Sequence, residues 1–194
     1  MLYAVVPVKT LVRAKSRLSP ALSFAQRLHL ARRFLRDTLA LLNQYPGACR
    51  TIVVSADQSV LRLARTKGMI ALPQTARGGI NRAVTLGCAL AKRRGAGSVV
   101  VIPTDLPHLT VGTLRDFARP ASRPTIRIAP DRHGAGTNAL YLQPVRPGFA
   151  RFGEQSLKRH RTVAQVSGRD AQLVRTDMLA FDVDVPADLL RPVS

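Results

Sequence analysis

Short apolar runs alternate with helical patterns along the first half of the chain. The runs cover residues 2–8, 51–55 and 98–103, and valine, isoleucine and leucine dominate them. A run that is apolar at nearly every position is typical of a strand covered on both faces in a parallel sheet. We therefore predict three buried strands in this half.

Helical periodicity fills the intervals between these strands. After Ser23, a residue type that caps helices, apolar residues recur every three or four positions as far as Leu42. A second helix is expected to follow Asp57 and to end near Gly68, and a third to cover residues 81–94. This alternation of strands and helices predicts βαβ units in a doubly wound sheet.

The second half of the chain is less regular. Residues 125–129 and 138–142 are typical of strands around a glycine-rich turn, and residues 181–185 of a late strand. We predict an α/β fold with a mostly parallel sheet, a mixed or antiparallel carboxyl-terminal portion and helices on both faces. The 194 residues contain no repeat, linker or low-complexity segment, so a single domain over residues 1–194 is expected.

Composition argues against several classes of protein. A hydrophobic content of 46% argues against global disorder, and no run approaches the ~18 apolar residues of a membrane span. The apolar start, residues 1–8, lacks the basic leader of a signal peptide. Cys49 and Cys88 have no metal-type spacing, and the histidines form no Ser-His-Asp or metal motif. We expect a cytoplasmic protein with reduced thiols.

The net charge of +19 indicates an anionic partner. Nucleic acid, a membrane surface and small anionic substrates all fit such a charge. Aromatic residues make up only 5% and are not interleaved with the scattered basic residues, as single-strand binders require. A phosphate-rich small molecule is therefore favoured. The alternative, a basic nucleic-acid-binding protein, would bind strands with a steep salt dependence that survives loss of the aspartates described next.

Asp105 follows the third apolar run, where ligands bind in open α/β sheets. Pro103 and Pro107 flank it and favour a defined loop. Helix capping explains this aspartate poorly, because the next helix is expected to begin at Thr110, five residues further on. We interpret Asp105 as a functional carboxylate.

Asp182 and Asp184 lie two residues apart in the predicted late strand, so their side chains share one face. Two neighbouring carboxylates repel each other, and a divalent cation is the usual relief. An alternative remains for Asp184, which can cap a short helix opened by Pro186.

Basic residues gather in the loop after the first strand. Lys9, Arg13, Lys15 and Arg17 can neutralise a triphosphate and stabilise a pyrophosphate leaving group, although a solvated loop is the alternative for any one of them. The loop has neither a Walker A motif nor a GxGxxG fingerprint.

Three further segments offer anion or nucleotide contacts. Gly134 and Gly136 permit close approach of an anion to the backbone, and Thr137 adds a hydroxyl. Ser156 begins a helical stretch whose backbone N–H groups suit a phosphate or carboxylate. Asn81 can meet a ribose or base, or it can simply cap its helix.

Taken in order, these segments resemble the 2-phospho-L-lactate guanylyltransferase family, which acts in coenzyme F-420 biosynthesis. The stretches that carry the resemblance span nearly the whole chain: VPVKTLVRAKSRLSP (6–20), VVSAD (53–57), GGINRAV (78–84), VVVIPTDLP (99–107), APDRHGAGTNAL (129–140), RFGEQS (151–156) with His160, and DVDVPADL (182–189). The resemblance implies a Rossmann-like, single-domain nucleotidyltransferase that uses GTP and Mg²⁺. Its second substrate would be 2-phospholactate, phosphoenolpyruvate or 3-phosphoglycerate.

The same resemblance implies roles for individual residues. Asp105, Asp182 and Asp184 would hold the metal, with Asp105 and Lys15 acting in catalysis. The residues implied for GTP are Lys9, Lys15, Arg17 and Asn81, and those for the phospho-acid are Thr137, Gly153 and Ser156. Many relatives have a GTGT turn where this chain has Gly134-Ala-Gly-Thr137, so one threonine hydroxyl is missing here.

The implied reaction is attack by a phosphate oxygen of the phospho-acid on the α-phosphorus of GTP, with release of pyrophosphate. A molybdopterin guanylyltransferase or nucleotide-sugar synthase is the related alternative, but such enzymes normally carry a glycine-rich first loop. The sequence leaves open which phospho-acid is used and whether the chain forms a homodimer. It also leaves open whether a downstream transferase takes up a labile product.

Overall fold

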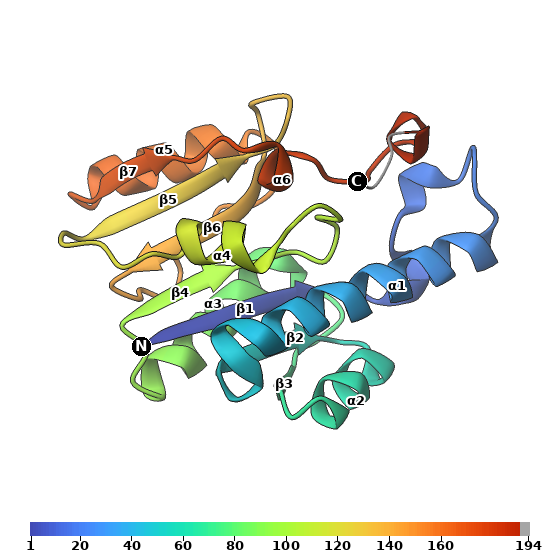
Figure 1. Cartoon of the computed structure of the whole chain (residues 1–194), viewed down its shortest axis with the longest axis horizontal. Coiled ribbons are helices and arrows are strands. Elements are labelled where there is room, and N and C mark those ends of the chain that lie inside the picture. The colour runs from blue at the N-terminus through green and yellow to red at the C-terminus, as the bar shows by residue number, and fades with distance from the viewer. Residues whose placement is uncertain (191–194) are drawn as a thin grey trace.

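The computed structural model describes residues 1–190, in which strands and helices alternate along the chain (Figure 1). The strands are β1 (Leu2–Val8), β2 (Thr51–Ser55), β3 (Ile70–Pro73), β4 (Ser98–Val101), β5 (Thr125–Pro130), β6 (Thr137–Gln143) and β7 (Asp170–Leu173). The α-helices are α1 (Phe24–Leu42), α2 (Gln58–Thr66), α3 (Gly79–Arg93), α4 (Val111–Phe117), α5 (Ser156–Val166) and α6 (Asp177–Ala180). The last four residues of the predicted domain lie outside the described part.

The seven strands form one sheet in the order β3-β2-β1-β4-β6-β5-β7. β1 pairs in parallel with both β2 and β4, and β6 is antiparallel to its two neighbours. The predicted mostly parallel sheet with an antiparallel carboxyl-terminal portion is thus confirmed. The chain passes from β1 to β2 on one side and reaches β4 on the other, so the carboxyl ends of β1 and β4 flank a topological switch point.

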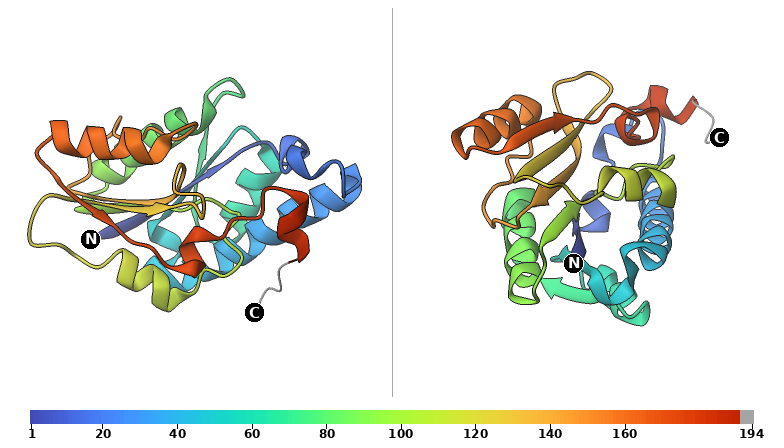
Figure 2. Two further views of the ribbon diagram at one scale, coloured as in Figure 1. Left: turned by 90° about the horizontal axis from the view of Figure 1, so that it is seen from above. Right: turned by 60° about the vertical axis from the view of Figure 1, so that its left-hand side comes forward.

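Helices cover both faces of the sheet, as predicted (Figure 2). On one face Val6 of β1 packs in a core with Leu35 and Leu39 of α1, which also includes side chains of α2 and α4. On the other face Val5 packs with residues of α3 and α5. Successive β1 side chains therefore enter opposite cores, which explains why this strand is apolar throughout. No helix within residues 1–190 is long and apolar enough to cross a membrane.

Three predicted helix starts are confirmed in detail. The Ser23 side chain accepts a hydrogen bond from the Gln26 N–H, Asp57 accepts from the Ser59 N–H, and Thr110 caps α4. The third helix begins two residues before the predicted position, at Gly79, so the alternative in which Asn81 is the N-cap is wrong.

The late strand predicted for residues 181–185 is wrong. This segment is not part of the sheet; the Val183 N–H instead donates to the backbone oxygen of Asp105 at 3.4 Å. Phe181 and Val183 pack with Leu18 and Phe34 in a small separate core. The alternation of apolar and acidic residues reflects this one-sided packing rather than strand pairing. Figure 1 shows the segment (red) close to the first loop (blue).

Candidate active site

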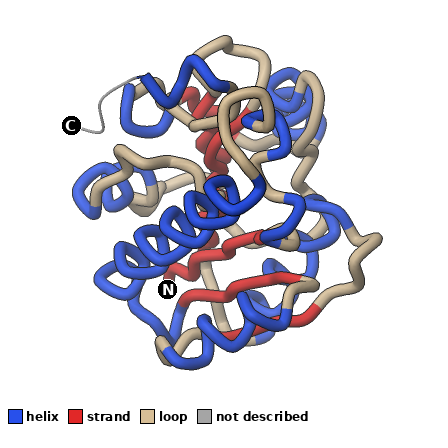
Figure 3. The backbone as a smooth tube through the Cα atoms, turned by 90° about the vertical axis from the view of Figure 1, so that its right-hand side faces the viewer, coloured by secondary structure: helices blue, strands red, loops and turns tan. Residues whose placement is uncertain are grey.

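Lys15 joins three segments beyond the carboxyl ends of β1 and β4. Its ammonium group donates to the Asp105 carboxylate at 2.8 Å and to the backbone oxygen of Val183 at 2.7 Å. The Lys15 side chain is only 8% exposed. Figure 3 views the molecule from this edge of the sheet. The first loop, the loop after β4 and the carboxyl-terminal segment therefore meet at one buried charge.

The backbone at Lys15 is left-handed, with a φ of 56°. This conformation costs a residue with a side chain roughly 1–2 kcal/mol relative to the right-handed form. It lies between two short 3₁₀ turns, Leu11–Arg13 and Ser16–Leu18. The Leu11 N–H donates to the Asp57 carboxylate at 3.0 Å, which holds the start of the loop against α2. The ion pair with Asp105 offsets the backbone cost and holds the loop inward.

The Asp184 carboxylate pairs with the Arg17 guanidinium at 2.7 Å. The backbone N–H groups of Asp184 and Val185 donate instead to Asp188, at 2.7 and 2.8 Å. The acid that receives these N–H groups before the 3₁₀ helix Pro186–Leu190 is thus Asp188, while the Asp184 carboxylate is engaged by Arg17.

Asp188 is buried and was not predicted as a site residue. Its carboxylate forms an ion pair with Arg132 at 2.6 Å. Although burial raises the pKa of Asp188, hydrogen bonds from Arg132 and from the two backbone N–H groups bring it below its ordinary value. The backbone N–H of Arg132 also donates to the backbone oxygen of Ala180. This ion pair links the glycine-rich turn before β6 to the segment that carries Asp182 and Asp184. The sequence gives no signal for the pair, because Asp188 is a single aspartate in a short helical motif.

The three predicted aspartates influence one another. Burial raises the pKa of Asp182, and the negative charges of Asp105 and Asp184 raise it further. Additional positive charge near Asp182 would relieve this repulsion. Carboxylate oxygens are the donors that Mg²⁺ prefers, and Mg²⁺ is commonly held by one or two carboxylates together with substrate phosphates. The donor chemistry therefore fits the cation that the sequence predicts.

Within residues 1–190 the side chains include suitable metal donors, but they are not arranged as a metal site. No group of three or more acidic, histidine or cysteine side chains lies in a metal-binding arrangement there. Lys15 and Arg17 supply the positive charge beside Asp105 and Asp184 instead. The metal role of the three aspartates stays a prediction.

A second group of polar residues surrounds the start of α5. Thr137 is half-buried, Ser156 is buried, and Gly153 has a φ of 117° that favours glycine. The Leu157 N–H donates to the Ala135 oxygen at 3.1 Å, which holds the glycine-rich turn against the helix start. A Cβ at Gly136 would lie 2.5 Å from the carboxylate of Asp131, so a larger residue there would displace the side chain that accepts from the Ala135 N–H. The predicted phospho-acid residues thus come together.

Asn81 is tied to the backbone of Phe152. Its amide nitrogen donates to the Phe152 oxygen at 3.0 Å, and its amide oxygen accepts from the Phe152 N–H at 2.7 Å. In this arrangement it anchors the segment before α5 to α3, and its predicted contact with ribose or base stays a prediction. Lys9, by contrast, is exposed directly after β1, where a phosphate can reach it.

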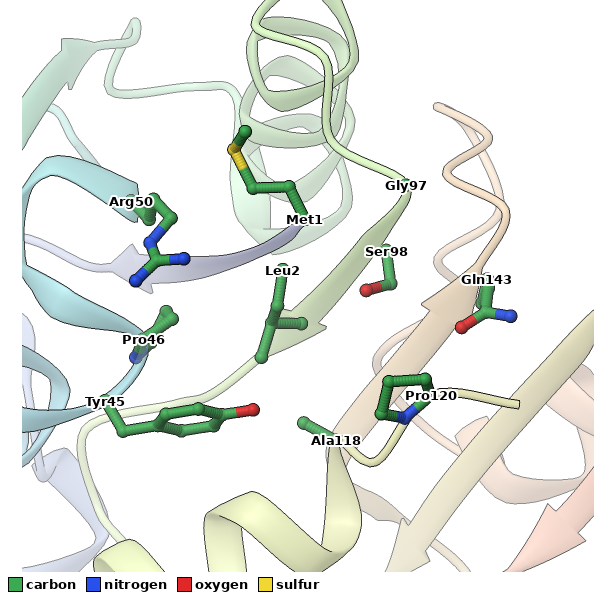
Figure 4. A pocket seen from close by; sticks show the side chains of 10 residues that line it. All are labelled: Met1, Leu2, Tyr45, Pro46, Arg50, Gly97, Ser98, Ala118, Pro120 and Gln143. Carbon is green, nitrogen blue, oxygen red and sulfur yellow. The ribbon is translucent and has the colours of Figure 1, made fainter. Parts of the chain in front are cut away.

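A cavity of about 430 Å³ lies at the opposite end of the sheet. Figure 4 shows Met1, Leu2 and Ser98, at the start of β1 and β4, among its lining residues. None of the predicted site residues lines it. Lys15 and Asp105 lie instead beyond the carboxyl ends of β1 and β4, where ligands bind in open α/β sheets.

Comparison with known proteins agrees with this geometry. The model of the family described as "Guanylyl transferase CofC like" matches residues 2–193. A phosphoenolpyruvate guanylyltransferase of Sphaerobacter thermophilus is 39% identical over 96% of this chain and 89% of its own. A 2-phospho-L-lactate guanylyltransferase of Methanothermobacter thermautotrophicus is 32% identical over 96% of this chain and 81% of its own.

Solved structures agree on the fold. A protein of Desulfovibrio desulfuricans G20, assigned to the nucleotide-diphospho-sugar transferases, superposes with a TM-score of 0.80 at 15% identity. The match covers 97% of this chain and 84% of the other. At this identity the likeness shows a shared fold alone.

Proposed function

Because the chain belongs to the CofC-like guanylyl transferase family, we propose that it transfers GMP from GTP to phosphoenolpyruvate and releases pyrophosphate. The chain is a nucleotidyltransferase enzyme by this membership. The choice of phosphoenolpyruvate rests on the name of the relative at 39% identity. 2-Phospholactate is the second candidate, because relatives of that name are 27% and 32% identical. 3-Phosphoglycerate stays a prediction from the resemblance.

One structural observation carries the proposal. A basic loop and an acidic segment meet at Lys15, at the carboxyl edge of the sheet where nucleotides bind in such folds. Lys9, Lys15 and Arg17 would face the GTP phosphates. The positive charge of Lys15 and Arg17 would stabilise the pyrophosphate as it leaves.

The reaction forms a bond between a phosphate oxygen of the phospho-acid and the α-phosphorus of GTP. The bond from that phosphorus to the bridging oxygen breaks, and the electron pair leaves with pyrophosphate. No general base is needed, because the attacking phosphate is already ionised near neutral pH. Bound Mg²⁺, held by Asp105, Asp182 and Asp184, would supply positive charge that neutralises the phosphates.

The group around the start of α5 would receive the phospho-acid. Ser156 and Thr137 offer hydroxyl donors, and Gly153 permits close approach of an anion to the backbone. The product would be a diphosphate that joins GMP to the phospho-acid. It would be the activated substrate of a transferase of coenzyme F-420 biosynthesis. Direct transfer to that downstream enzyme and a homodimeric state remain predictions.

Pyrophosphate release from GTP tests the proposal. With Mg²⁺ present, we expect release that requires phosphoenolpyruvate or 2-phospholactate as well as GTP. Asp105→Asn should lower turnover by at least about 100-fold, the range seen when one electrostatic contact to a transition state is lost. Asp37→Asn, an exposed aspartate of α1 outside the predicted set, is the matched control. No release from the unaltered protein with any of the three phospho-acids would refute the proposed function.

A further inference from the structure

His160 lies at the centre of the group around the start of α5, and both of its ring nitrogens have hydrogen-bond partners. Its Nε2 accepts from the backbone N–H of Arg151 at 2.9 Å. Its Nδ1 lies 3.0 Å from the Thr137 hydroxyl oxygen. The residue is 2% exposed, so both bonds are shielded from water.

The first of these bonds fixes the tautomer of the ring. A backbone N–H can only donate, so Nε2 must carry a lone pair and no hydrogen. Burial, aided by the positive charge of Arg151, lowers the pKa of His160 to about 4, although a hydrogen bond with the Ser156 backbone acts in the opposite direction. The ring is therefore neutral at pH 7, and its single hydrogen is on Nδ1.

The second bond follows from the first. Since Nδ1 carries the hydrogen, it donates to the Thr137 oxygen, and the Thr137 hydroxyl cannot use its own hydrogen on His160. That hydrogen is available to another acceptor, and Thr137 is half-buried, so part of the residue is open to a ligand. A hydroxyl whose oxygen already accepts from His160 is a donor suited to an anionic oxygen.

We propose that His160 is a positioning residue that holds the Thr137 hydroxyl as a donor to an anionic oxygen of the phospho-acid. The inference rests on the proposed function of this site. It assigns His160 a role through Thr137 and no direct contact with the substrate.

The surroundings hold the ring in place. Phe152 packs edge-on against the imidazole, with the ring centroids 5.0 Å apart. The two hydrogen bonds between Asn81 and the backbone of Phe152 hold that backbone in place. Arg151, whose N–H sets the tautomer, is the preceding residue. α3 thus contributes to the orientation of a hydroxyl on β6 through one continuous chain of contacts.

Two substitutions separate the two bonds of His160. The amide of glutamine extends as far as Nε2, so His160→Gln keeps an acceptor for the Arg151 N–H and loses the donor to Thr137. The shorter amide of asparagine lies near Nδ1, so His160→Asn keeps the donor to Thr137. We expect His160→Gln to raise the KM for phosphoenolpyruvate roughly tenfold or more, the scale of one hydrogen bond to a charged group. His160→Asn should stay close to the unaltered enzyme, and the KM for GTP should change little in both.

Thr137→Val provides the second test. If His160 acts through Thr137, His160→Gln should have no further effect on the KM for phosphoenolpyruvate once the hydroxyl is gone. Additive effects of the two substitutions would overturn the inference, as would equal losses in His160→Gln and His160→Asn. These comparisons require an active unaltered enzyme; its inactivity would refute the proposed function instead.

A measurement that needs no activity completes the test. In protein labelled with ¹⁵N at histidine, we expect the His160 ring to show a protonated Nδ1 and an unprotonated Nε2 at pH 7. The signal is assigned by its loss in His160→Gln. A proton on Nε2 would overturn the inference whatever the kinetics show.

Discussion

Lys15 shows how much of the site depends on single residues. Its ammonium group donates to both Asp105 and the Val183 oxygen, and its backbone at this position is left-handed. Strained residues of this kind persist where the surrounding contacts determine them. In the proposed reaction the Lys15 ammonium group would turn from Asp105 toward the GTP phosphates.

The buried His160 predicts a pH dependence of stability. Its pKa is about 4 in the folded protein and 6.5 in its ordinary state, so the unfolded chain binds more protons between these values. The free energy of unfolding should therefore fall as the pH is lowered from 6.5 to about 4. The contribution of this residue corresponds to roughly 3 kcal/mol. Urea denaturation at several pH values, compared between the unaltered protein and His160→Gln, measures it. Equal slopes in the two proteins would contradict the assignment.

Among the elements, α3 packs unusually close to the sheet at Gly87. A Cβ at this position would lie 2.5 Å from Val5 and 3.3 Å from Val54, within the core that supports the carboxyl edge. We expect Gly87→Ala to lower the free energy of unfolding by about 1–3 kcal/mol through overpacking.

Gly112, in α4, is the matched control for this substitution. The nearest atom to a Cβ there lies 3.8 Å away, and the position is exposed. Gly112→Ala should raise the free energy of unfolding by up to about 1 kcal/mol, because alanine favours the helix. Chemical denaturation of both variants measures these opposite changes in the free energy of unfolding. A loss of stability in both would show that the close approach at Gly87 is not what destabilises Gly87→Ala.

The elements also show what the sequence predicts and what it does not. Strands with apolar residues at every position, such as β1 and β2, were predicted with their correct bounds because both faces are covered. β7 was missed, since it is a four-residue edge strand with mostly exposed side chains and no β-branched residue. The sequence wrongly predicts a strand at residues 181–185 because one-sided packing produces the same alternation as strand pairing.

The candidate site shows a similar division. The position of Asp105 beyond a strand end follows from topology, so the sequence is enough to predict it. The partners of Asp105 depend on how distant segments fold together: Lys15 and Val183 are 90 and 78 residues away from it in the chain. The ion pair of Asp188 with Arg132 has the same origin, and no local pattern marks it.

For the molecule as a whole, a net charge of +19 attracts anionic substrates over a distance set by the salt concentration. We expect the KM for GTP to rise several-fold when NaCl is increased from about 0.05 to 0.5 M, with a smaller change in kcat. Steady-state kinetics at several salt concentrations measure this, and sucrose at matched osmolarity is the control. A KM for GTP that is independent of salt would show that the basic residues are solvated and do not influence substrate capture.

The central claim is GMP transfer to a phospho-acid, and mass spectrometry of the product tests it most directly. The protein is incubated with Mg²⁺, GTP and each of phosphoenolpyruvate, 2-phospholactate and 3-phosphoglycerate. We predict a guanylylated phosphoenolpyruvate whose two phosphates are joined, formed together with pyrophosphate and absent from the Asp105→Asn reaction. Unchanged GTP in all three reactions, or its hydrolysis without any guanylylated acid, would contradict the claim.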